Sequence, residues 1–386
     1  ALILGNFFVN IFYVFFAISA IYHYKNLYNF FYSKIFYLLL LFLICLIINL
    51  IFSINITNSF PRLIKFILII LFVSEIQRVI FKNDYLIDKV IFIWNIIFFI
   101  VTADIIFELL FGFNTLGFRS PMPGRISSFF GDELVVGSFY HFFSLFILAY
   151  LIKKKTSDSK ILIISLIFIF VSFFIGERAN FVRLFISILI FLFIINNSSF
   201  LKKISVTILI LLSLSIMPLL NNDLKHRYYY QVKSLYSKNG FITYFKESQY
   251  GAHQATAFEI FRKNILVGIG VKNFRIESKK DIYRNDEYKK TMYRQATHPH
   301  QIHVELLSET GLLGYLSFLT LIIYSLYFSI LNYLKNKNLF QLSTIIFLIT
   351  SLIPVLPTGS IFSTFYGGIF WFNFGLMFSF NKLTKV

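Results

Sequence analysis

The sequence THPHQIHVELLSETGLLG, residues 297–314, joins the polar segment 221–300 to a hydrophobic helix. Its three histidines and two glutamates therefore fall at the boundary between water and lipid. In integral membrane proteins, ionisable groups that gather at one face usually mark a site of chemistry or binding. This stretch predicts a functional site at the outer end of a membrane span.

The composition of the chain indicates a membrane protein. It contains 57% hydrophobic and 14% charged residues, with a mean hydropathy of +0.74, whereas soluble domains contain about 25% charged residues. The single cysteine, Cys45, lies in an apolar run and excludes both a disulfide framework and a cysteine zinc site. The net charge of +18 lies mostly beside the apolar runs and in segment 221–300. Membrane lipids and anionic lipid-linked substrates are therefore expected partners, rather than nucleic acid.

The apolar runs predict an all-α polytopic membrane protein, because a spanning helix needs about 20 apolar residues. About eleven such runs are centred near residues 12, 43, 71, 99, 143, 168, 188, 211, 317, 347 and 370. We expect helices one to eight in residues 1–220, a large periplasmic loop with short helices in 221–300, and helices nine to eleven in 301–386. Because the chain begins with Ala1 rather than Met, we also expect an N-terminal span in a longer gene product, which would then have about twelve.

Loop charges predict the orientation of these spans. Lysine-rich loops alternate with lysine-poor ones, and cytoplasmic loops carry the excess of Lys and Arg. The basic residues of the lysine-rich loops are Lys25, Lys34, Arg78, Lys82, Lys89, Lys153, Lys154, Lys155, Lys160, Lys202, Lys203, Lys335, Lys337, Lys382 and Lys385. The C-terminus is therefore expected inside, and segment 221–300 outside.

The short outward loops carry mostly arginine as their cations. These residues are Arg62, Arg119, Arg125, Arg178 and Arg183. A guanidinium group binds phosphate through two parallel hydrogen bonds, which lysine cannot match. The alternative is that an arginine at a span end reaches the lipid headgroups along its flexible stem.

Two outward connections contain candidate ligands. In GRISSFFGDELVVGS, residues 124–138, Arg125 is placed to bind a phosphate and Glu133 to orient it, although the acids of this loop also suit the N-terminus of the next helix. In GERANF, residues 176–181, Glu177 and Arg178 lie near headgroup depth, where such groups are either paired with each other or used in binding.

Segment 253–266, which begins with His253, has apolar residues at helical spacing and predicts an amphipathic helix along the membrane surface. That apolar set is Ala257, Phe258, Phe261 and Ile265. The pattern breaks at Gly268-Ile269-Gly270 and continues with Lys272 and Arg275. Such a segment folds around a phosphate or a sugar acid, or forms a plain turn.

Proline restricts the backbone around residues 298–300, so His298 and His300 are expected to be held in place. The helix that follows, about 302–332, would be roughly 45 Å long and exceed a 30 Å membrane core. We therefore expect its first turns, with Glu305 and Glu309 on one face, to project outward beside His300. A metal site with His303 is not favoured, because no HExxH arrangement is present.

In these segments the chain resembles the O-antigen ligase and O-antigen polymerase superfamily of bacterial surface-polysaccharide assembly. The match is carried by ERANF (177–181), GRISSFFGDELVVGS (124–138), NILVGIGVKNFR (264–275) and THPHQIHVELLSETGLLGYL (297–316). The last is the most specific, since members of the family typically show His-Pro-His-Asn before a Leu-rich helix with a Glu and a Gly pair. Here Gln301 stands where Asn is usual, and the cysteine pair that relatives often carry around this loop is lacking.

The resemblance implies a metal-independent, inverting glycosyl transfer without a cofactor, at the periplasmic side of the bacterial inner membrane. The donor would be undecaprenyl-pyrophosphate-linked glycan. The acceptor would be the lipid A core for a ligase, or a second lipid-linked repeat for a polymerase, which the divergent loop favours. His300 matches the base that deprotonates the acceptor hydroxyl, and Arg178 the pyrophosphate-binding arginine. The further candidate ligands of pyrophosphate or glycan are Arg125, Lys272, Arg275, His298, Glu177, Glu133, Glu309 and His253.

Two other classes of function are compatible with a polytopic membrane protein. A flippase for the same lipid-linked glycan predicts internal repeats and ionisable groups within the membrane. The span interiors contain few such groups, among them Glu75, Asp104 and Glu108, which we interpret as buried partners of the outward arginines or as a small polar path. A purely structural membrane subunit would not need the histidines and arginines of the outward face.

Overall fold

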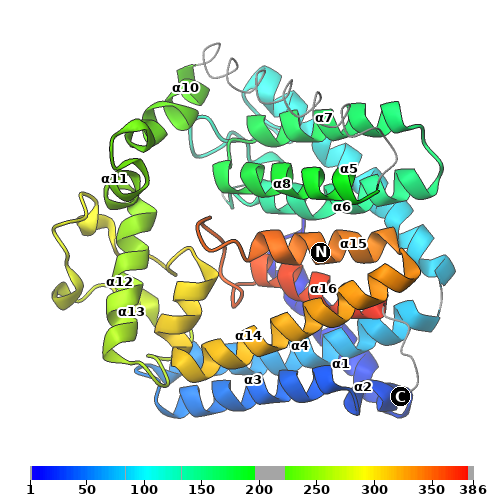
Figure 1. Ribbon diagram of the computed structural model, residues 1–386, viewed down its shortest axis with the longest axis horizontal. Helices are drawn as coiled ribbons and strands as arrows, with labels where there is room; N and C mark the ends of the chain where they lie inside the picture. The colour runs from blue at the N-terminus through cyan, green and yellow to red at the C-terminus, as the bar shows by residue number, and fades with distance from the viewer. Residues whose placement is uncertain (1, 83, 132, 196–221, 381–386) are drawn as a thin grey trace. The chain divides into compact units, whose positions relative to one another are not determined.

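The protein is all helical, as the sequence predicts. The computed structural model describes residues 2–82, 84–131, 133–195 and 222–380, and these form α-helices and short 3₁₀ helices without any strand (Figure 1). The chain divides into two compact units. The first unit comprises Ala1–Gly5, Ile80–Lys233 and Tyr333–Ser351, and the second comprises Asn6–Val79, Ser234–Asn332 and Leu352–Val386.

Helices occupy the predicted span centres except the one near residue 211, which lies outside the described residues. They are α1 (Asn6–Tyr22), α3 (Lys34–Ile51), α4 (Ile56–Lys82), α5 (Asp84–Phe111), α6 (Val136–Lys153), α7 (Asp158–Phe174), α8 (Arg178–Ile195), α14 (Ile302–Asn336), α15 (Leu339–Ser351) and α16 (Phe365–Ser379). Among the described residues, 5 helices are long and apolar enough to cross a membrane, namely α3, α5, α6, α8 and α14. Helices α1 and α15 are shorter apolar helices. A polytopic membrane protein is thus supported, and the count of eleven spans stays a prediction.

The first unit is built around α6. This helix is buried from Val136 to Ala149, and Figure 1 shows it beside α7 and α8. Helices α5 and α15 also pack against it. The contacts are largely aromatic: the ring of Trp94 lies 5.2 Å from that of Phe143, and Phe142 lies 5.1 Å from Phe347. Edge-to-face pairs of this kind stabilise the packing beyond the area that they bury.

In the second unit, four helices meet at one aromatic cluster. Phe42 of α3 lies 5.1 Å from Phe66 of α4 and 5.7 Å from Phe318 of α14, and Phe66 lies 5.3 Å from Trp371 of α16. All four side chains are fully buried. This cluster therefore positions α14, whose N-terminal end follows the histidine motif.

Helix α14 is not the continuous long helix expected from the sequence, because it breaks at Gly311 (φ 65°, ψ −169°). The loop 265–270 fits into the break. Ile269 and Gly270 donate their N–H groups to the carbonyls of Ser308 (3.1 Å) and Glu309 (2.9 Å), and Leu312 donates to Ile265 (2.8 Å). A helix interruption leaves backbone N–H and C=O groups without hydrogen-bond partners, and the loop 265–270 supplies those partners.

Gly268 and Gly311 allow the loop and the broken helix to touch. Both have positive φ angles, and a Cβ added to Gly311 would lie 2.6 Å from the nitrogen of Gly268. A Cβ added to Gly268 would likewise lie 2.6 Å from the nitrogen of Gly311. The glycine-rich segment, for which a phosphate-binding loop and a plain turn were the alternatives, is therefore a partner of the helix break.

Segment 222–300 contains the predicted short helices and is shared between the two units. Its elements are α10 (Asn222–Tyr228), η3 (Tyr230–Tyr236), α11 (Gly240–Glu247), α12 (Gln249–Lys263), α13 (Phe274–Glu277), η4 (Asp281–Tyr283) and η5 (Thr291–Tyr293). Near the N-terminus, η1 (Tyr24–Leu27) and α2 (Tyr28–Phe31) connect α1 to α3, and η2 (Ser128–Phe130) precedes α6.

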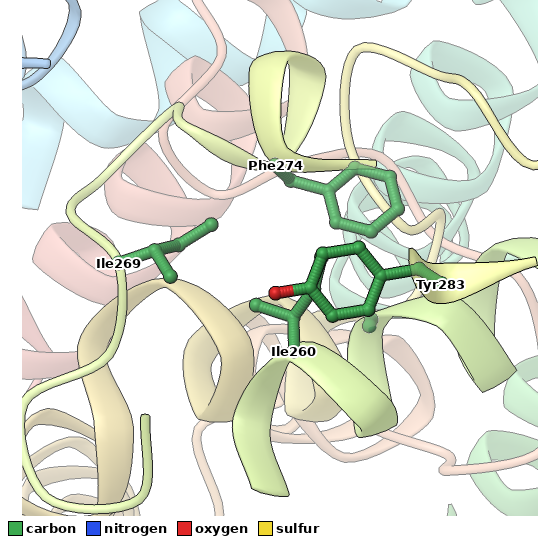
Figure 2. Close-up of a cluster of buried hydrophobic side chains, with 5 residues drawn as sticks. Ile260, Ile269, Phe274 and Tyr283 are labelled. Carbon is green, nitrogen blue, oxygen red and sulfur yellow. The ribbon is translucent and has the colours of Figure 1, made fainter. Parts of the chain in front are cut away.

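Helix α12 confirms the predicted amphipathic helix, of whose apolar face one part is buried in the protein, and its position along the membrane surface stays a prediction. Figure 2 shows Ile260 packed with Ile269, Phe274 and Tyr283, and Ala257 belongs to the same buried cluster. By contrast, two members of the expected face, Phe258 and Ile265, are 41% and 48% exposed. The buried part of this face is the part that contacts Ile269, Phe274 and Tyr283 of the following loop. Helical periodicity alone does not reveal where this loop packs.

Candidate functional site

Three histidines gather in the second unit, as the sequence predicted for two of them. The ring of His300 lies 4.0 Å from that of His298 and 5.3 Å from that of His253, measured between centroids. The ring of Tyr250 completes the group at 5.3 Å from His300. His253, on α12, is held by a hydrogen bond of 2.9 Å between its Nε2 and the carbonyl of Tyr293. We call these four residues the histidine cluster.

The backbone of His300 has a left-handed conformation, with φ at 55°. Non-glycine residues rarely adopt this conformation, and it persists at sites where surrounding contacts enforce it. Here the N–H of Thr358 donates to the carbonyl of His300 (2.8 Å). The next residue, Gln301, donates to the carbonyl of Pro354 (2.9 Å) and accepts from the N–H of Val304 (3.0 Å). The side chain of Gln301 thus provides a hydrogen-bond acceptor for a free backbone N–H of the first turn of α14, at a position where Asn is usual in the family.

Desolvation favours the uncharged form of the three histidines of this cluster. Desolvation, followed by repulsion from His253 and Lys272, lowers the pKa of His300 to about 4. Desolvation, followed by repulsion from His300, holds the pKa of His298 well below its usual value, and burial also lowers the pKa of His253. A neutral imidazole at pH 7 has a free nitrogen lone pair. His300 is therefore in the protonation state that a general base requires.

The side chains of Glu305 and Glu309 are both completely buried, and the expected projection of the first turns of α14 beyond the membrane stays a prediction. Glu309 accepts hydrogen bonds from the backbone N–H groups of Lys272 (2.7 Å) and Phe274 (3.2 Å). The ammonium of Lys272 lies 3.6 Å from Glu305 and donates to Ser360 (2.6 Å). The break at Gly311 turns the first arm of α14 into the protein, where both carboxylates hold segment 272–274.

The turn between α7 and α8 forms a second charged cluster, in the first unit. Arg178 is the first residue of α8, as the motif GERANF predicted. Its neighbour Glu177 does not pair with it but lies 3.2 Å from Arg125. Glu177 also accepts from the N–H of Gly137 (3.1 Å) and from Asn180 (2.6 Å). The ion pair that sequence adjacency suggested is therefore made with a residue from another loop.

Loop 124–138 differs from the expectation in one further respect. Arg125 donates to the carbonyl of Leu134 (2.8 Å) and pairs with Glu177, whereas Glu133, expected to act together with Arg125, is exposed. At the N-terminus of α6, the N–H of Gly137 donates to Glu177 from the turn between α7 and α8. Asp132 lies outside the described residues.

Arg227 of α10 joins this second cluster and was missed by sequence reasoning. Its Nε donates to the carbonyl of Gly176 (3.0 Å), while Arg178 donates to the carbonyl of Arg227 (3.2 Å). The neighbouring Tyr228 is influenced by all three arginines. Burial raises the pKa of its hydroxyl, and the positive charges of Arg227, Arg178 and Arg125 oppose that rise. The signal in the sequence was the basic run LKHR at the start of the large loop. Three guanidinium groups and Glu177 thus surround one turn.

The acidic residues within the helices do not pair with the outward arginines, contrary to that interpretation. Asp104 accepts from the side chain (2.6 Å) and the N–H (2.8 Å) of Thr115, and Glu108 accepts from the N–H of Ser128 (2.6 Å). Glu75 pairs with Arg78 at 2.5 Å. Asp104 and Glu108 thus bind the segment between α5 and α6, and Glu75 binds an arginine of its own helix.

The remaining histidine of the motif is engaged elsewhere. The ring nitrogens of His303 lie 2.9 Å from the carbonyl of Leu352 and 3.2 Å from the hydroxyl of Tyr315. Among the described residues, no group of three or more His, Cys, Asp or Glu side chains is arranged to hold a metal ion.

The fold and the two clusters describe a helical membrane protein with basic and imidazole groups at the ends of its helices. Residues 161–319 match the family model of O-antigen ligase, and no match to the chain was found among curated proteins. The match confirms the resemblance over this segment: residues 161–319 are similar to the O-antigen ligase domain of membrane enzymes that assemble surface polysaccharides. Arg178, Lys272 and His300 lie within the matched segment, and Arg125 lies before it.

Proposed function

We propose that this protein transfers a glycan from undecaprenyl pyrophosphate to an acceptor hydroxyl at the periplasmic face of the bacterial inner membrane. In this proposal the C-terminus is cytoplasmic and most of segment 221–300 is periplasmic. The observation that carries the proposal is the half-buried imidazole of His300, whose pKa is lowered by desolvation and which lies within the segment that matches O-antigen ligase. A histidine in this state serves a reaction in which an alcohol must lose a proton.

The proposed reaction needs one proton acceptor and one stabilised leaving group. The acceptor oxygen attacks the anomeric carbon, and the bond from that carbon to the pyrophosphate oxygen breaks with its electron pair. Attack from the opposite side inverts the configuration. The hydroxyl proton passes to His300, and undecaprenyl pyrophosphate leaves. General base action contributes about 10² to 10⁴ in rate, so loss of His300 should slow transfer strongly without abolishing donor binding.

The pyrophosphate is assigned to Arg178, with Arg125 as its neighbour. Charge-assisted hydrogen bonds from guanidinium groups stabilise the negative charge that develops on the leaving oxygens. Supporting this assignment, the cluster in the first unit holds three arginines with Glu177. In this proposal arginines take the part that metal ions play in other transferases. The other predicted ligands stay predictions for the pyrophosphate or the glycan: Lys272, Arg275, His298, His253, Glu133, Glu177 and Glu309.

The acceptor distinguishes two versions of the enzyme. A ligase joins the glycan to the lipid A core, whereas a polymerase joins one lipid-linked repeat to another, and we favour the polymerase because the large loop diverges in sequence. Disruption of the gene followed by gel analysis of the surface glycan separates them. Core carrying a single repeat indicates a polymerase, and core without attached sugar indicates a ligase.

A reconstituted transfer assay tests the proposal itself. Protein in liposomes receives lipid-linked glycan and acceptor, and the elongated or transferred product is quantified for the wild type, His300→Ala and His226→Ala. His226 is an exposed histidine of α10 and serves as the matched control. We expect at least about a hundredfold slower turnover for His300→Ala only. Full activity of that variant would refute the assignment of the base.

A further inference from the structure

Helix α4 brings two cations to the second unit that the predicted site did not include. Arg62 and Lys65 follow Pro61 near the start of α4, three residues apart, so they lie on neighbouring positions of one helix surface. Both side chains are half-buried. Lys65 donates to the hydroxyl of Thr364 (3.0 Å) and lies 5.6 Å above the ring of Tyr13. Arg62 belongs to a helix, not to the loop in which the sequence placed it.

These two cations face two more from the segment beyond the glycine turn. The start of α4 contacts this segment directly, because Ser59 donates to the carbonyl of Val271 (2.9 Å) and Asn58 donates to the side chain of Asn273 (3.2 Å). Arg62 is repelled by Arg275 and attracted by Glu309. Lys65 in turn is repelled by Arg62 and Lys272. The four side chains come from α4, from the loop at 272 and from α13, all within one unit. We call Arg62, Lys65, Lys272 and Arg275 the cation cluster.

The carboxylates nearby do not neutralise the cation cluster. Four positive charges stand against Glu305 and Glu309, so at least two positive charges remain even when both acids are ionised. Lys272 uses Glu305 and Ser360 as its partners, and Glu309 binds backbone N–H groups. The Nε of Arg275 is buried without a hydrogen-bond partner among the described residues. Partly buried like charges and an unsatisfied donor both cost free energy, which a bound anion would offset.

We propose that Arg62, Lys65 and Arg275 bind a phosphate group carried by a lipid. Two arginines held near each other present planar forks that match phosphate oxygens, and Lys65 adds a point charge. Segment 358–360 connects this site to the histidine cluster, because Thr358 donates to the carbonyl of His300 and Ser360 accepts from Lys272. Its occupant is either the diphosphate of a second lipid-linked repeat, the acceptor of the polymerase version, which rests on the proposed function, or the headgroup of an anionic phospholipid, which does not.

Binding measurements on the full chain test this site without any glycosyl transfer. The protein is placed in nanodiscs of phosphatidylcholine, and inorganic pyrophosphate is titrated by calorimetry. In a second arm, phosphatidylglycerol is mixed into the nanodiscs and its retention by the protein is quantified. The variants are Arg62→Gln, Lys65→Gln and Arg275→Gln. The control is Arg262→Gln, which removes an exposed arginine of α12 that pairs with Glu259.

We expect each cluster variant to weaken binding of one of the two probes about tenfold or more, as loss of a charge-assisted hydrogen bond implies, and Arg262→Gln to leave it unchanged. If the variants weaken pyrophosphate binding, the occupant is the diphosphate of a lipid-linked repeat. If they weaken only the retention of phosphatidylglycerol, the occupant is a phospholipid headgroup. Lys65→Arg keeps the charge and should restore binding, which separates the site from a folding defect. If neither probe responds to Arg62 and Arg275 in folded variants, the proposal is overturned. The proposed transferase activity is judged separately by His300→Ala, which should leave pyrophosphate binding intact.

Discussion

The imidazole rings of His253 and His300 stack on each other, with centroids 5.3 Å apart and planes inclined by 25°. One ring comes from α12 and the other from the loop before α14. Because His253 is buried and His300 is half-buried, a proton on one ring raises the free energy of a proton on the other. The stack therefore favours the neutral form of His300, which can accept a proton from an alcohol.

Replacing His253 should move the acid limb of the pH–rate profile. In His253→Phe a ring of similar shape keeps the burial of His300 but removes a group that can repel its protonated form. We expect the pKa of His300 to rise from about 4 toward its usual value, so transfer should begin to fail at a higher pH. The measurement is the rate of glycan transfer from pH 4 to 8. An acid limb that stays in place or moves to lower pH would show that His253 does not act on His300.

The histidine cluster should also make the protein less stable in acid. The pKa of His300 is lower in the folded state than in the unfolded chain, so between these two values the unfolded state binds more protons. The free energy of unfolding should fall by up to roughly 3 kcal/mol as the pH drops from about 6.5 to about 4, with His298 adding in the same direction.

Unfolding midpoints recorded in detergent from pH 4 to 8 measure this acid effect. His300→Phe, which cannot be protonated, should flatten the curve, whereas His226→Ala, at an exposed position, should leave it unchanged. An equally steep acid loss in His300→Phe would place the responsible groups elsewhere in the protein.

Arg178→Ala should impair the use of the donor. The side chain lies at the start of α8 with Arg125 and Arg227 close to the same turn, and its loss removes a guanidinium that we assign to pyrophosphate. We expect the donor concentration for half-maximal rate to rise about tenfold or more. Initial rates at varied donor concentration give this value. Arg119→Ala, which removes an exposed arginine, is the control, and an unchanged donor dependence in Arg178→Ala would remove it from the pyrophosphate site.

The helices were predictable because apolar runs of sufficient length leave few alternatives in a membrane. The turn before Arg178 and the closeness of His298 to His300 were also predictable, but for another reason: each depends only on residues that are close in sequence. The partner of Glu177 was not predictable, because Arg125 reaches it from a different loop. The position of Lys65 beside Lys272 likewise depends on how α4 packs, which periodicity does not encode.

The break in α14 escaped prediction for a related reason. Within the apolar sequence TGLLGYL, Gly311 is compatible with a continuous helix at a cost of only about 1 kcal/mol. What ends the first arm is the loop 265–270, which supplies hydrogen bonds to both sides of the break. A long-range backbone contact therefore decides where the two glutamates point.

Gly311→Ala tests whether this contact holds the site together. The variant places a Cβ at a positive φ angle, which costs roughly 1–2 kcal/mol by itself, and within 3 Å of Gly268 and the carbonyl of Leu266. Gly117→Ala is the matched control, because Gly117 also has a positive φ but nothing within 4 Å of its added Cβ. We expect Gly311→Ala to lower the unfolding midpoint more than Gly117→Ala and to slow transfer, since the loop leads directly into the segment with Lys272. Equal effects of the two substitutions would mean that backbone strain alone matters, and that the loop does not need the break in α14 to keep its place.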